Sequence, residues 1–300
     1  MMKLGFIGLG IMGKPMALRL INKGYDVYVF DIDAKKVSDV VNEGGIGARS
    51  AKEVAAHSEI TFTIVPNSEH VEEVIFGENG IASGAKEGHI VVDMSSISPA
   101  VSKRLAEKLA KQNIHMLDAP VSGGEQGAID GTLAIMVGGE YAIFERVKPL
   151  MACMGKEITY VGGHGAGTTT KLANQIIVNV NIAAMAEAFT LAAKAGIDVE
   201  KLYMAIRSGL AGSRVLDMKA PMILERNFQA GGRIDINLKD LNNVLNFAES
   251  IEMDTPLTAR VAQMFRALAD EGKATLDHCG LIQYYEKKEN IVVKRRDGSE

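Results

Sequence analysis

The sequence predicts an α/β fold in which a doubly wound parallel sheet is followed by an all-α C-terminal domain. Three observations favour this fold class. Short apolar runs alternate with helix-like segments over about the first 160 residues, helical spacing then continues along the chain, and the Gly-rich stretch 162–167 separates the two patterns. We therefore predict a first domain at residues 1–163 and an all-helical second domain at 164–300, which begins with a long interdomain helix.

Six short runs rich in apolar and β-branched residues predict the strands of the first domain. Segments with helical spacing separate several of them, so we expect parallel strands joined by right-handed crossovers. Because the early strands are almost wholly apolar, helices should cover both faces of the sheet. The predicted strands are Leu4–Leu9, Val27–Phe30, Ile60–Val65, Ile90–Met94, Met116–Leu117 and Ile135–Val137.

The second domain should be built around one long helix from Thr168 to about Ala195. A helix that is apolar nearly all round is buried on several sides. We expect this helix to form the spine of its domain or to pack against a partner subunit, which favours a homo-oligomer. Its apolar residues are Leu172, Ile176, Ile177, Val180, Ala183, Ala184, Ala188 and Leu191.

Composition narrows the class of protein and of ligand. The 300 residues suit two ordinary domains, and 47% apolar with 23% charged residues is typical of folded globular chains. A formal net charge of −4 gives no reason to expect nucleic acid or an anionic membrane as partner. Small molecules are therefore the expected ligands.

Cysteine usage and the N-terminus point to the cytoplasm. Cys153 and Cys279 lie far apart and the six histidines are scattered, so neither a disulfide framework nor a metal site is expected. The N-terminus lacks a signal-peptide pattern. The uncharged stretch 172–186 contains four Asn and Gln residues and is shorter than a bilayer span, so we expect no membrane anchor.

The stretch "GFIGLGIMGKPM" predicts a dinucleotide-binding loop of the Rossmann type. Gly8 permits a tight turn, Gly10 lets the backbone approach a pyrophosphate, and Gly13 lets the next helix pack closely on the strand. Ile11 and Met12 complete the loop, and the helix N-terminus favours phosphate. A lone motif of this kind is also compatible with an ordinary glycine turn, so its context matters.

The context is an acidic residue at the end of the next strand. Asp31 ends "YDVYVFD" where this fold places a carboxylate that binds the ribose hydroxyls, and such a carboxylate repels a 2′-phosphate. We therefore predict NAD (NADH) as the cofactor. Lys35 and Lys36 leave NADP open as the less favoured choice.

Two further strand ends border the predicted cofactor crevice. They supply Val65 and Pro66 in "IVPNS" and Ser96 in "DMSS". Carboxyl ends of parallel strands line such a crevice. Ordinary turn and helix-cap chemistry explains Ser96 equally well.

Lys171 heads the long apolar helix and is the candidate catalytic residue. Hydride transfer to a carbonyl needs a group that donates a proton, and a lysine can serve when burial lowers its pKa from about 10.4. Asn174 lies three residues later, on the same helix face. A solvated lysine in the first turn is the alternative.

Two more segments are candidate substrate contacts. In "DAPVSGG", Ser122, Gly123 and Gly124 offer a hydroxyl and accessible backbone N–H groups that could bind a carboxylate, although a flexible turn is equally compatible. In "NLKDL", Lys239 and Asp240 are either an interior polar pair or part of a solvated helix face.

Together these motifs resemble the β-hydroxyacid dehydrogenase family over essentially the whole chain. The resemblance rests on "GFIGLGIMGKPM", "DAPVSGG", "GAGTTTKLANQ" and "KDL", which occur in the family's order and spacing. It implies that Lys171 is the general acid/base, that Asn174 supports it, and that residues 122–124 hold the substrate carboxylate. It also implies that Lys239 lies near nicotinamide and substrate with Asp240 beside it, and that the protein forms dimers or tetramers. Gln175 stands where many members have a second Asn.

Within the family, three segments are most similar to tartronate semialdehyde reductases. They are "VPNSEHVEEVIFGENGI", "SGGEQGAIDGTL" and "GLAGSRVLDMKAPMILERNF". This similarity implies reversible, NADH-dependent reduction of tartronate semialdehyde to D-glycerate. A 3-hydroxyisobutyrate dehydrogenase or a succinic semialdehyde reductase would use the same residues, and a dinucleotide sensor without catalysis would keep the fold.

Overall fold

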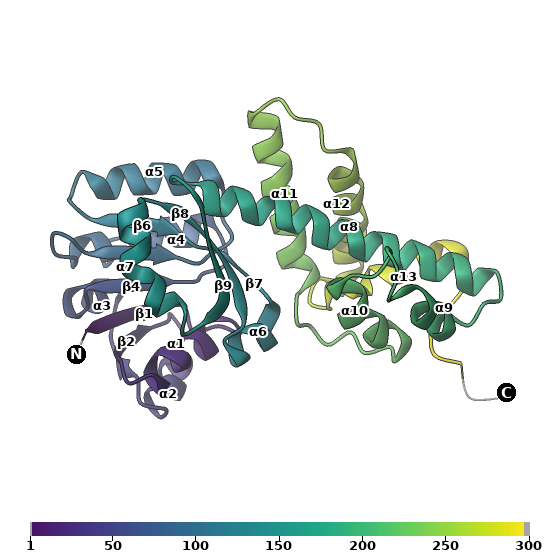
Figure 1. Ribbon diagram of the computed structural model, residues 1–300, viewed down its shortest axis with the longest axis horizontal. Helices are drawn as coiled ribbons and strands as arrows, with labels where there is room; N and C mark the ends of the chain where they lie inside the picture. Colours follow the sequence, from purple (N-terminus) through teal and green to yellow (C-terminus); the bar gives the residue numbers. More distant parts are fainter. Residues whose placement is uncertain (1, 297–300) are drawn as a thin grey trace. The chain divides into compact units, whose positions relative to one another are not determined.

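The computed structural model describes residues 2–296, and their contacts divide the chain into two compact units between Lys171 and Leu172. The division falls inside the long helix α8 (Ala166–Lys194), later than the predicted boundary between residues 163 and 164. Unit 1 holds a sheet of nine strands with flanking helices, and unit 2 is helical (Figure 1). The α/β fold class expected from the sequence is confirmed.

The sheet of unit 1 has the order β3-β2-β1-β4-β5-β6-β8-β7, with β9 paired to β8. Strands β1 to β6 are parallel, which places the end of each near the end of its neighbour. The strands are β1 (Lys3–Ile7), β2 (Asp26–Phe30), β3 (Ile46–Gly47), β4 (Ile60–Thr63), β5 (Ile90–Asp93), β6 (His115–Asp118), β7 (Val121–Ser122), β8 (Leu133–Gly139) and β9 (Gly155–Gly162).

One part of the sheet differs from the all-parallel expectation. Strand β8 runs antiparallel to both β6 and β7. The connection from β6 to β8, residues 119–132, holds the two-residue β7 and the seven-residue helix α6 (Gly124–Asp130). Strand β7 pairs with β8 directly, as antiparallel strands joined by a local connection do.

Helices cover both faces of the sheet, as the apolar strands predict. Along β5, Ile90 and Val92 face one core cluster and Val91 faces the other. The first cluster packs against α1 (Gly13–Asn22), α2 (Ala34–Val41), α6 and α7 (Tyr141–Met151). The second packs against α3 (Ala51–His57), α4 (Ser68–Phe76), the short turn η1 (Ile81–Ser83) and α5 (Pro99–Ala110).

Unit 2 consists of helices around the C-terminal part of α8. Within residues 172–296 no strand is present, and the only β-type pairing is the single bridge Arg233–Asp277. The core side of α8 supplies Ile182, Met185, Ala186 and Phe189. The other elements are α9 (Val199–Ile206), α10 (Arg214–Leu224), α11 (Ile234–Ser250), α12 (Pro256–Leu268), η2 (Ala269–Lys273), η3 (His278–Leu281) and α13 (Ile282–Glu289).

Helix α8 is not buried all round within one chain. Ile177 is 64% exposed and Leu191 is 72% exposed, and Ala184 and Ala188 on the same side are exposed as well. By length and composition alone α8 could also cross a membrane, since its most apolar window has a mean hydropathy of 1.7 and 44% of that window is buried. The core side of α8 is buried as expected, and the exposed stripe is compatible with the alternative expectation that this helix packs against a partner subunit.

Candidate active site

The glycine loop joins β1 to α1, and its three glycines meet different surroundings. A Cβ on Gly8, whose φ is +93°, would lie 2.1 Å from the carbonyl oxygen of Ile64, and one on Gly13 would lie 1.8 Å from that of Gly8. A Cβ on Gly10 would meet no described atom within 4 Å. Gly8 and Gly13 are thus required by packing, whereas Gly10 keeps an open backbone surface that fits a pyrophosphate.

The N-terminus of α1 completes this surface. Met12 is the N-cap residue, and no side chain of the described residues makes a capping hydrogen bond there. Ile11, the preceding residue, is 55% exposed. In the first turn the Lys14 N–H donates to the Gly10 carbonyl oxygen and Pro15 has no N–H. The helix dipole therefore remains as the feature that favours an anion at this end of α1.

Asp31, directly after β2, is tied to the glycine loop. Its Oδ2 accepts the backbone N–H of Leu9 at 2.7 Å, and its Oδ1 accepts that of Asp33 at 2.9 Å. The Lys36 ammonium lies 3.8 Å from Oδ1. The carboxylate therefore sits beside the loop, as a ribose-binding acidic residue must.

The strand ends that carry Val65, Pro66 and Ser96 are organised by two neighbours that the sequence analysis did not single out as site residues. Ser95 Oγ accepts the Val65 N–H at 2.9 Å and donates to Asp93 Oδ1 at 2.6 Å. Ser95 is 1% exposed and Asp93 is fully buried, whereas Ser96 is half-buried. The visible signal was an acidic residue inside the apolar run "IVVDM".

The environment of Asp93 opposes its charge. Burial raises the pKa of this carboxyl to about 6, against hydrogen bonds from Ser95 and Thr63 that lower it. Asp118, its partner in the next strand, also raises it through like charge. Such a buried carboxyl is costly for folding and calls for a reason in the site.

Asp118 ends β6 and caps the first turn of α8. Its Oδ1 accepts the N–H of Gly165 at 2.8 Å, and its Oδ2 accepts the N–H of Thr168 at 2.8 Å and the Thr168 hydroxyl at 3.2 Å. Burial raises the pKa of Asp118, while these hydrogen bonds lower it. The first residue of "DAPVSGG" thus fixes the helix that carries Lys171.

Lys171 lies one turn beyond this cap and is buried, with 8% of its surface exposed. The alternative of a solvated first-turn lysine is therefore wrong. A buried ammonium is expensive unless it has polar partners. The Asp118 carboxylate satisfies the N–H groups of Gly165 and Thr168 and so holds the end of α8 that carries Lys171.

Residues 122–124 form a defined strand-to-helix turn. β7 ends at Ser122 and α6 begins at Gly124, with φ of +138° at Gly123 and +66° at Gly124. Both values lie where glycine is favoured. The segment therefore has the backbone geometry of a glycine turn between β7 and α6.

In unit 2, Lys239 and Asp240 form a largely interior pair rather than a solvated face. Lys239 Nζ lies 3.0 Å from Asp240 Oδ1, and the side chains are 24% and 5% exposed. Asp240 Oδ2 accepts a 2.6 Å hydrogen bond from Gln175 Nε2, and Gln175 Oε1 accepts one of 3.0 Å from Asn174 Nδ2. Gln175 thus links Asn174 on α8 to Asp240 on α11, a role that the sequence analysis did not foresee.

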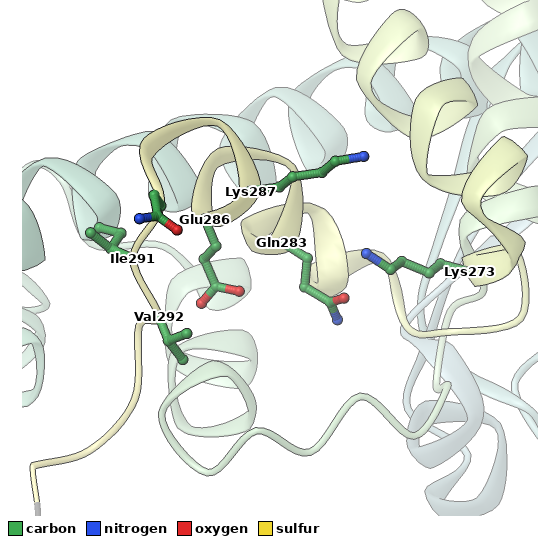
Figure 2. A pocket seen from close by; sticks show the side chains of 7 residues that line it. Lys273, Gln283, Glu286, Lys287, Ile291 and Val292 are labelled. Atoms are coloured by element: carbon green, nitrogen blue, oxygen red, sulfur yellow. The ribbon is translucent and has the colours of Figure 1, made fainter.

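A cavity of about 310 Å³ in unit 2 is lined by none of these residues (Figure 2). The charges that line it are engaged with neighbours. Glu286 accepts from Arg226, while Lys273 and Lys287 both pair with Glu271. Its remaining lining residues are Gln283, Asn290, Ile291 and Val292. None of them is a predicted site residue, so this hollow is not the candidate active site.

Comparison with known proteins gives consistent matches along the chain. Residues 3–162 match the family described as the NAD binding domain of 6-phosphogluconate dehydrogenase. Residues 165–285 match the family described as NAD-binding of NADP-dependent 3-hydroxyisobutyrate dehydrogenase. Both parts of the chain therefore match NAD(P)-dependent dehydrogenases.

Individual relatives match this chain over nearly their full length. A 2-hydroxy-3-oxopropionate reductase of Escherichia coli is 45% identical over 96% of this chain and 99% of its own. A 3-hydroxyisobutyrate dehydrogenase of Pseudomonas aeruginosa is 34% identical over 96% and 100%. The crystal structure of a 3-hydroxyisobutyrate dehydrogenase from Salmonella typhimurium has a TM-score of 0.86 at 30% identity and covers 94% of this chain and 99% of its own. The chain belongs to the β-hydroxyacid dehydrogenase family of NAD(P)-binding oxidoreductases, which act on CH–OH groups.

Proposed function

We propose that the protein catalyses reversible, NADH-dependent reduction of tartronate semialdehyde (2-hydroxy-3-oxopropanoate) to D-glycerate. Buried Lys171, one turn beyond the Asp118 cap, is the observation that carries the chemistry. The choice of substrate is supported by the 45% identity with a 2-hydroxy-3-oxopropionate reductase over nearly the whole of both chains. That reductase is named for this reaction.

NADH rather than NADPH is favoured by Asp31. Its carboxylate is held beside the glycine loop by the Leu9 N–H and would face the ribose hydroxyls. A 2′-phosphate would meet that negative charge. The Lys36 ammonium, 3.8 Å away, offsets only part of the charge because it is half exposed.

The chain's own groups would divide the work as follows. When bound, NADH supplies the hydride that is added to the aldehyde carbon. The Lys171 ammonium donates its proton to the carbonyl oxygen, which becomes the new hydroxyl, and its charge stabilises the developing oxyanion. The Ser122 hydroxyl and the N–H groups of Gly123 and Gly124 donate to the substrate carboxylate.

Asn174 and Lys239 would contribute orientation and charge. Asn174 lies three residues after Lys171 on α8 and supports the substrate with its amide. Lys239, paired with Asp240, adds a positive charge that favours an anionic substrate. The Gln175 hydrogen bonds would hold both contributions in register.

A homo-oligomer also fits this structure. The exposed stripe on α8, comprising Ile177, Ala184, Ala188 and Leu191, is apolar, and contiguous exposed apolar surface marks an interaction site. A second copy of the chain would cover it symmetrically.

The decisive experiment follows NADH and NADPH oxidation at 340 nm with tartronate, methylmalonate and succinate semialdehydes. Wild type and Lys171→Ala are assayed together. We expect the highest kcat/KM for NADH with tartronate semialdehyde. The variant should lose about 10²- to 10⁴-fold in kcat, the usual contribution of general acid/base catalysis, and still bind NADH.

Each result bears on a different part of the proposal. A higher kcat/KM with methylmalonate or succinate semialdehyde would overturn the substrate, and a preference for NADPH would overturn the argument from Asp31. Full turnover by Lys171→Ala would remove Lys171 from the mechanism. Lys171→Met serves as the control for packing, since it keeps the apolar length of the side chain without a proton donor.

A further inference from the structure

Two carboxylates lie at the ends of parallel strands that border the cofactor crevice of unit 1. Asp31 follows β2 and binds the Leu9 N–H of the glycine loop directly. Asp93 ends β5 and reaches the segment after β4 through the Ser95 hydroxyl. Each carboxylate thus ties its own strand end to the neighbouring one, and only Asp31 has a role in the proposed function.

The second tie is a two-step relay. Asp93 Oδ1 accepts the Ser95 hydroxyl at 2.6 Å, and Ser95 Oγ in turn accepts the Val65 N–H at 2.9 Å. Because an ionised carboxylate can only accept, it sets the direction of the Ser95 proton and leaves the Ser95 lone pairs for the Val65 N–H. The hydroxyl is therefore oriented by the charge behind it.

The relay ends on a segment that supports the glycine loop. The Ile64 carbonyl oxygen lies 2.1 Å from where a Cβ on Gly8 would be, and Val65 Cγ1 lies 3.2 Å from the same point. The Ile64 Cγ2 methyl is likewise 2.9 Å from a Cβ position on Gly13. Residues 64 and 65 therefore form the floor on which the loop rests, and a shift of Val65 would move that floor.

A contribution to the stability of the fold does not explain why a carboxylate stands at position 93. It is fully buried, its Oδ2 has no hydrogen-bond partner among residues 2–296, and the carboxylate of Asp118 lies opposite on β6. An apolar residue at the end of this apolar strand would avoid the desolvation cost of a carboxylate. The contacts that Asp93 does make go to Ser95 and Thr63, which belong to the two strand ends in question.

We propose that Asp93 and Ser95 are positioning residues for the dinucleotide, holding Val65 and with it the floor of the glycine loop in the geometry that binds the pyrophosphate and nicotinamide half. Asp93 and Ser95 do not contact the cofactor themselves and act on its binding through the position of Val65. The inference rests on the proposed dinucleotide-dependent function but is independent of which aldehyde is reduced.

The test measures NADH affinity by calorimetry without any aldehyde, together with thermal unfolding. Ser95→Ala removes the middle of the relay and should weaken NADH binding about tenfold, equivalent to roughly 1.4 kcal/mol. KM for NADH should rise in parallel, while kcat at saturating NADH stays within about twofold. Ser95→Thr keeps the hydroxyl and should restore most of the affinity.

Thr63→Val is the matched control. It removes a 2.8 Å hydrogen bond to the same oxygen of Asp93 but leaves the path from Ser95 to Val65 intact. A purely structural role of Asp93 predicts that Ser95→Ala and Thr63→Val lower Tm alike and leave NADH affinity unchanged. That result would overturn the proposal, whereas a loss of affinity confined to Ser95→Ala supports it.

A milder variant covers the case in which Ser95→Ala does not fold. Asp93→Asn retains an acceptor oxygen without the charge, and we expect a loss of NADH affinity of about threefold to tenfold. Wild-type affinity in folded Asp93→Asn would count against the relay. Because NADH binding is read without substrate, failure of the tartronate semialdehyde assignment would leave this result unaffected.

Discussion

The carboxylate of Asp118 accepts the backbone N–H of Thr168 at 2.8 Å, so that the end of a central strand caps a helix fifty residues further along the chain. Replacing a helix cap by alanine costs about 0.5–2 kcal/mol. We expect Asp118→Ala to lower the free energy of unfolding by at least this amount. It should also lower kcat by about tenfold or more, because Lys171 lies one turn beyond the cap and small displacements of a catalytic group are costly.

Thr168→Ala provides the comparison for that variant. It removes the hydroxyl, which lies 3.2 Å from Asp118 Oδ2 and 3.0 Å from the Gly165 carbonyl oxygen, and leaves both backbone N–H donors to Asp118 in place. Urea unfolding and steady-state kinetics on the two variants separate the effect of losing the Asp118 carboxylate from the effect of losing the Thr168 hydroxyl. Equal kcat in Asp118→Ala and wild type would show that the position of Lys171 does not depend on Asp118.

Gly10 and Gly13 should fail in different ways when changed to alanine. A Cβ at position 10 meets no described atom within 4 Å, so Gly10→Ala should fold with an unchanged Tm and bind NADH more weakly. A Cβ at position 13 would lie 1.8 Å from the Gly8 carbonyl oxygen, so Gly13→Ala should lower Tm as well. Calorimetric NADH titration and thermal unfolding check both, and normal NADH binding by Gly10→Ala would contradict the assigned cradle.

Gln175→Glu should make activity depend on pH in a way that Gln175→Leu does not. The introduced carboxyl replaces the donor that binds Asp240 Oδ2 at 2.6 Å. Ionising two carboxyls at that distance is costly, so a shared proton holds them together at low pH and their charges repel once it is lost at high pH. We expect the kcat/KM of Gln175→Glu to fall as pH rises, relative to wild type.

Gln175→Leu is the control, because it removes the same hydrogen bonds without adding a charge. Its kcat/KM should be reduced about tenfold at every pH, since Asn174 loses the acceptor that orients it. Parallel pH profiles for the two variants would argue against a role of Gln175 between Asn174 and Asp240.

His89 should make the fold less stable in mild acid. Burial lowers the pKa of this histidine to about 4, with the ring 3.0 Å from the Thr61 hydroxyl. Since an unfolded histidine titrates near 6.5, the unfolded state takes up a proton first as pH falls. His89 therefore does not lower the free energy of unfolding above about pH 6.5. Between pH 6.5 and pH 4 it lowers this free energy progressively, by about 2 kcal/mol at pH 5.

The measurement is urea unfolding of wild type and His89→Gln at pH 8 and pH 5. The variant should lose about 2 kcal/mol less between these values than wild type. Asp93 acts in the opposite direction, since its pKa is raised to about 6 and its proton stabilises the folded state as pH falls below that value. Wild type and His89→Gln both contain Asp93, so comparing them removes its contribution. If the free energy of unfolding depended on pH identically in both, His89 would take up its proton equally in the folded and unfolded states.

The apolar stripe on α8 predicts an effect on assembly. Leu191→Glu places a charge in the stripe and should convert the proposed homo-oligomer to monomer in sedimentation velocity. Leu210→Glu is the control, because Leu210 is fully exposed in the segment between α9 and α10. Dissociation by both variants, or by neither, would exclude the stripe as the interface.

Signals that lie close together in the sequence predicted much of this structure. The glycine spacing, the acidic end of β2 and the six apolar runs all correspond to observed elements. The burial of Lys171 agrees with the uncharged residues that follow it. Local patterns succeed here because turns, strands and helix faces depend on neighbours within a few residues.

The polar network of the site could not be predicted in this way. Ser95 and Val65 are 30 positions apart, Asp118 and Thr168 are 50 apart, and Gln175 and Asp240 are 65 apart. Which of these side chains meet depends on the order of strands and on helix packing. Strands β3, β7 and β9 were not predicted. For β3 and β7 the reason is their length, since a two-residue pairing has no periodicity of its own.

The bond between Asp31 and Leu9 has a practical consequence for coenzyme engineering. A designer who wants NADPH would normally begin by replacing the acidic residue, but here that change would also release a backbone N–H of the glycine loop. The preference between NADH and NADPH and the geometry of the glycine loop would then change together. The neighbouring Ile32 is 92% exposed and its side chain cannot hydrogen-bond, so an arginine introduced there would offer a 2′-phosphate a partner while Asp31 stays in place. In this scaffold the proposed preference for NADH is therefore better altered by adding an arginine at position 32 than by removing Asp31.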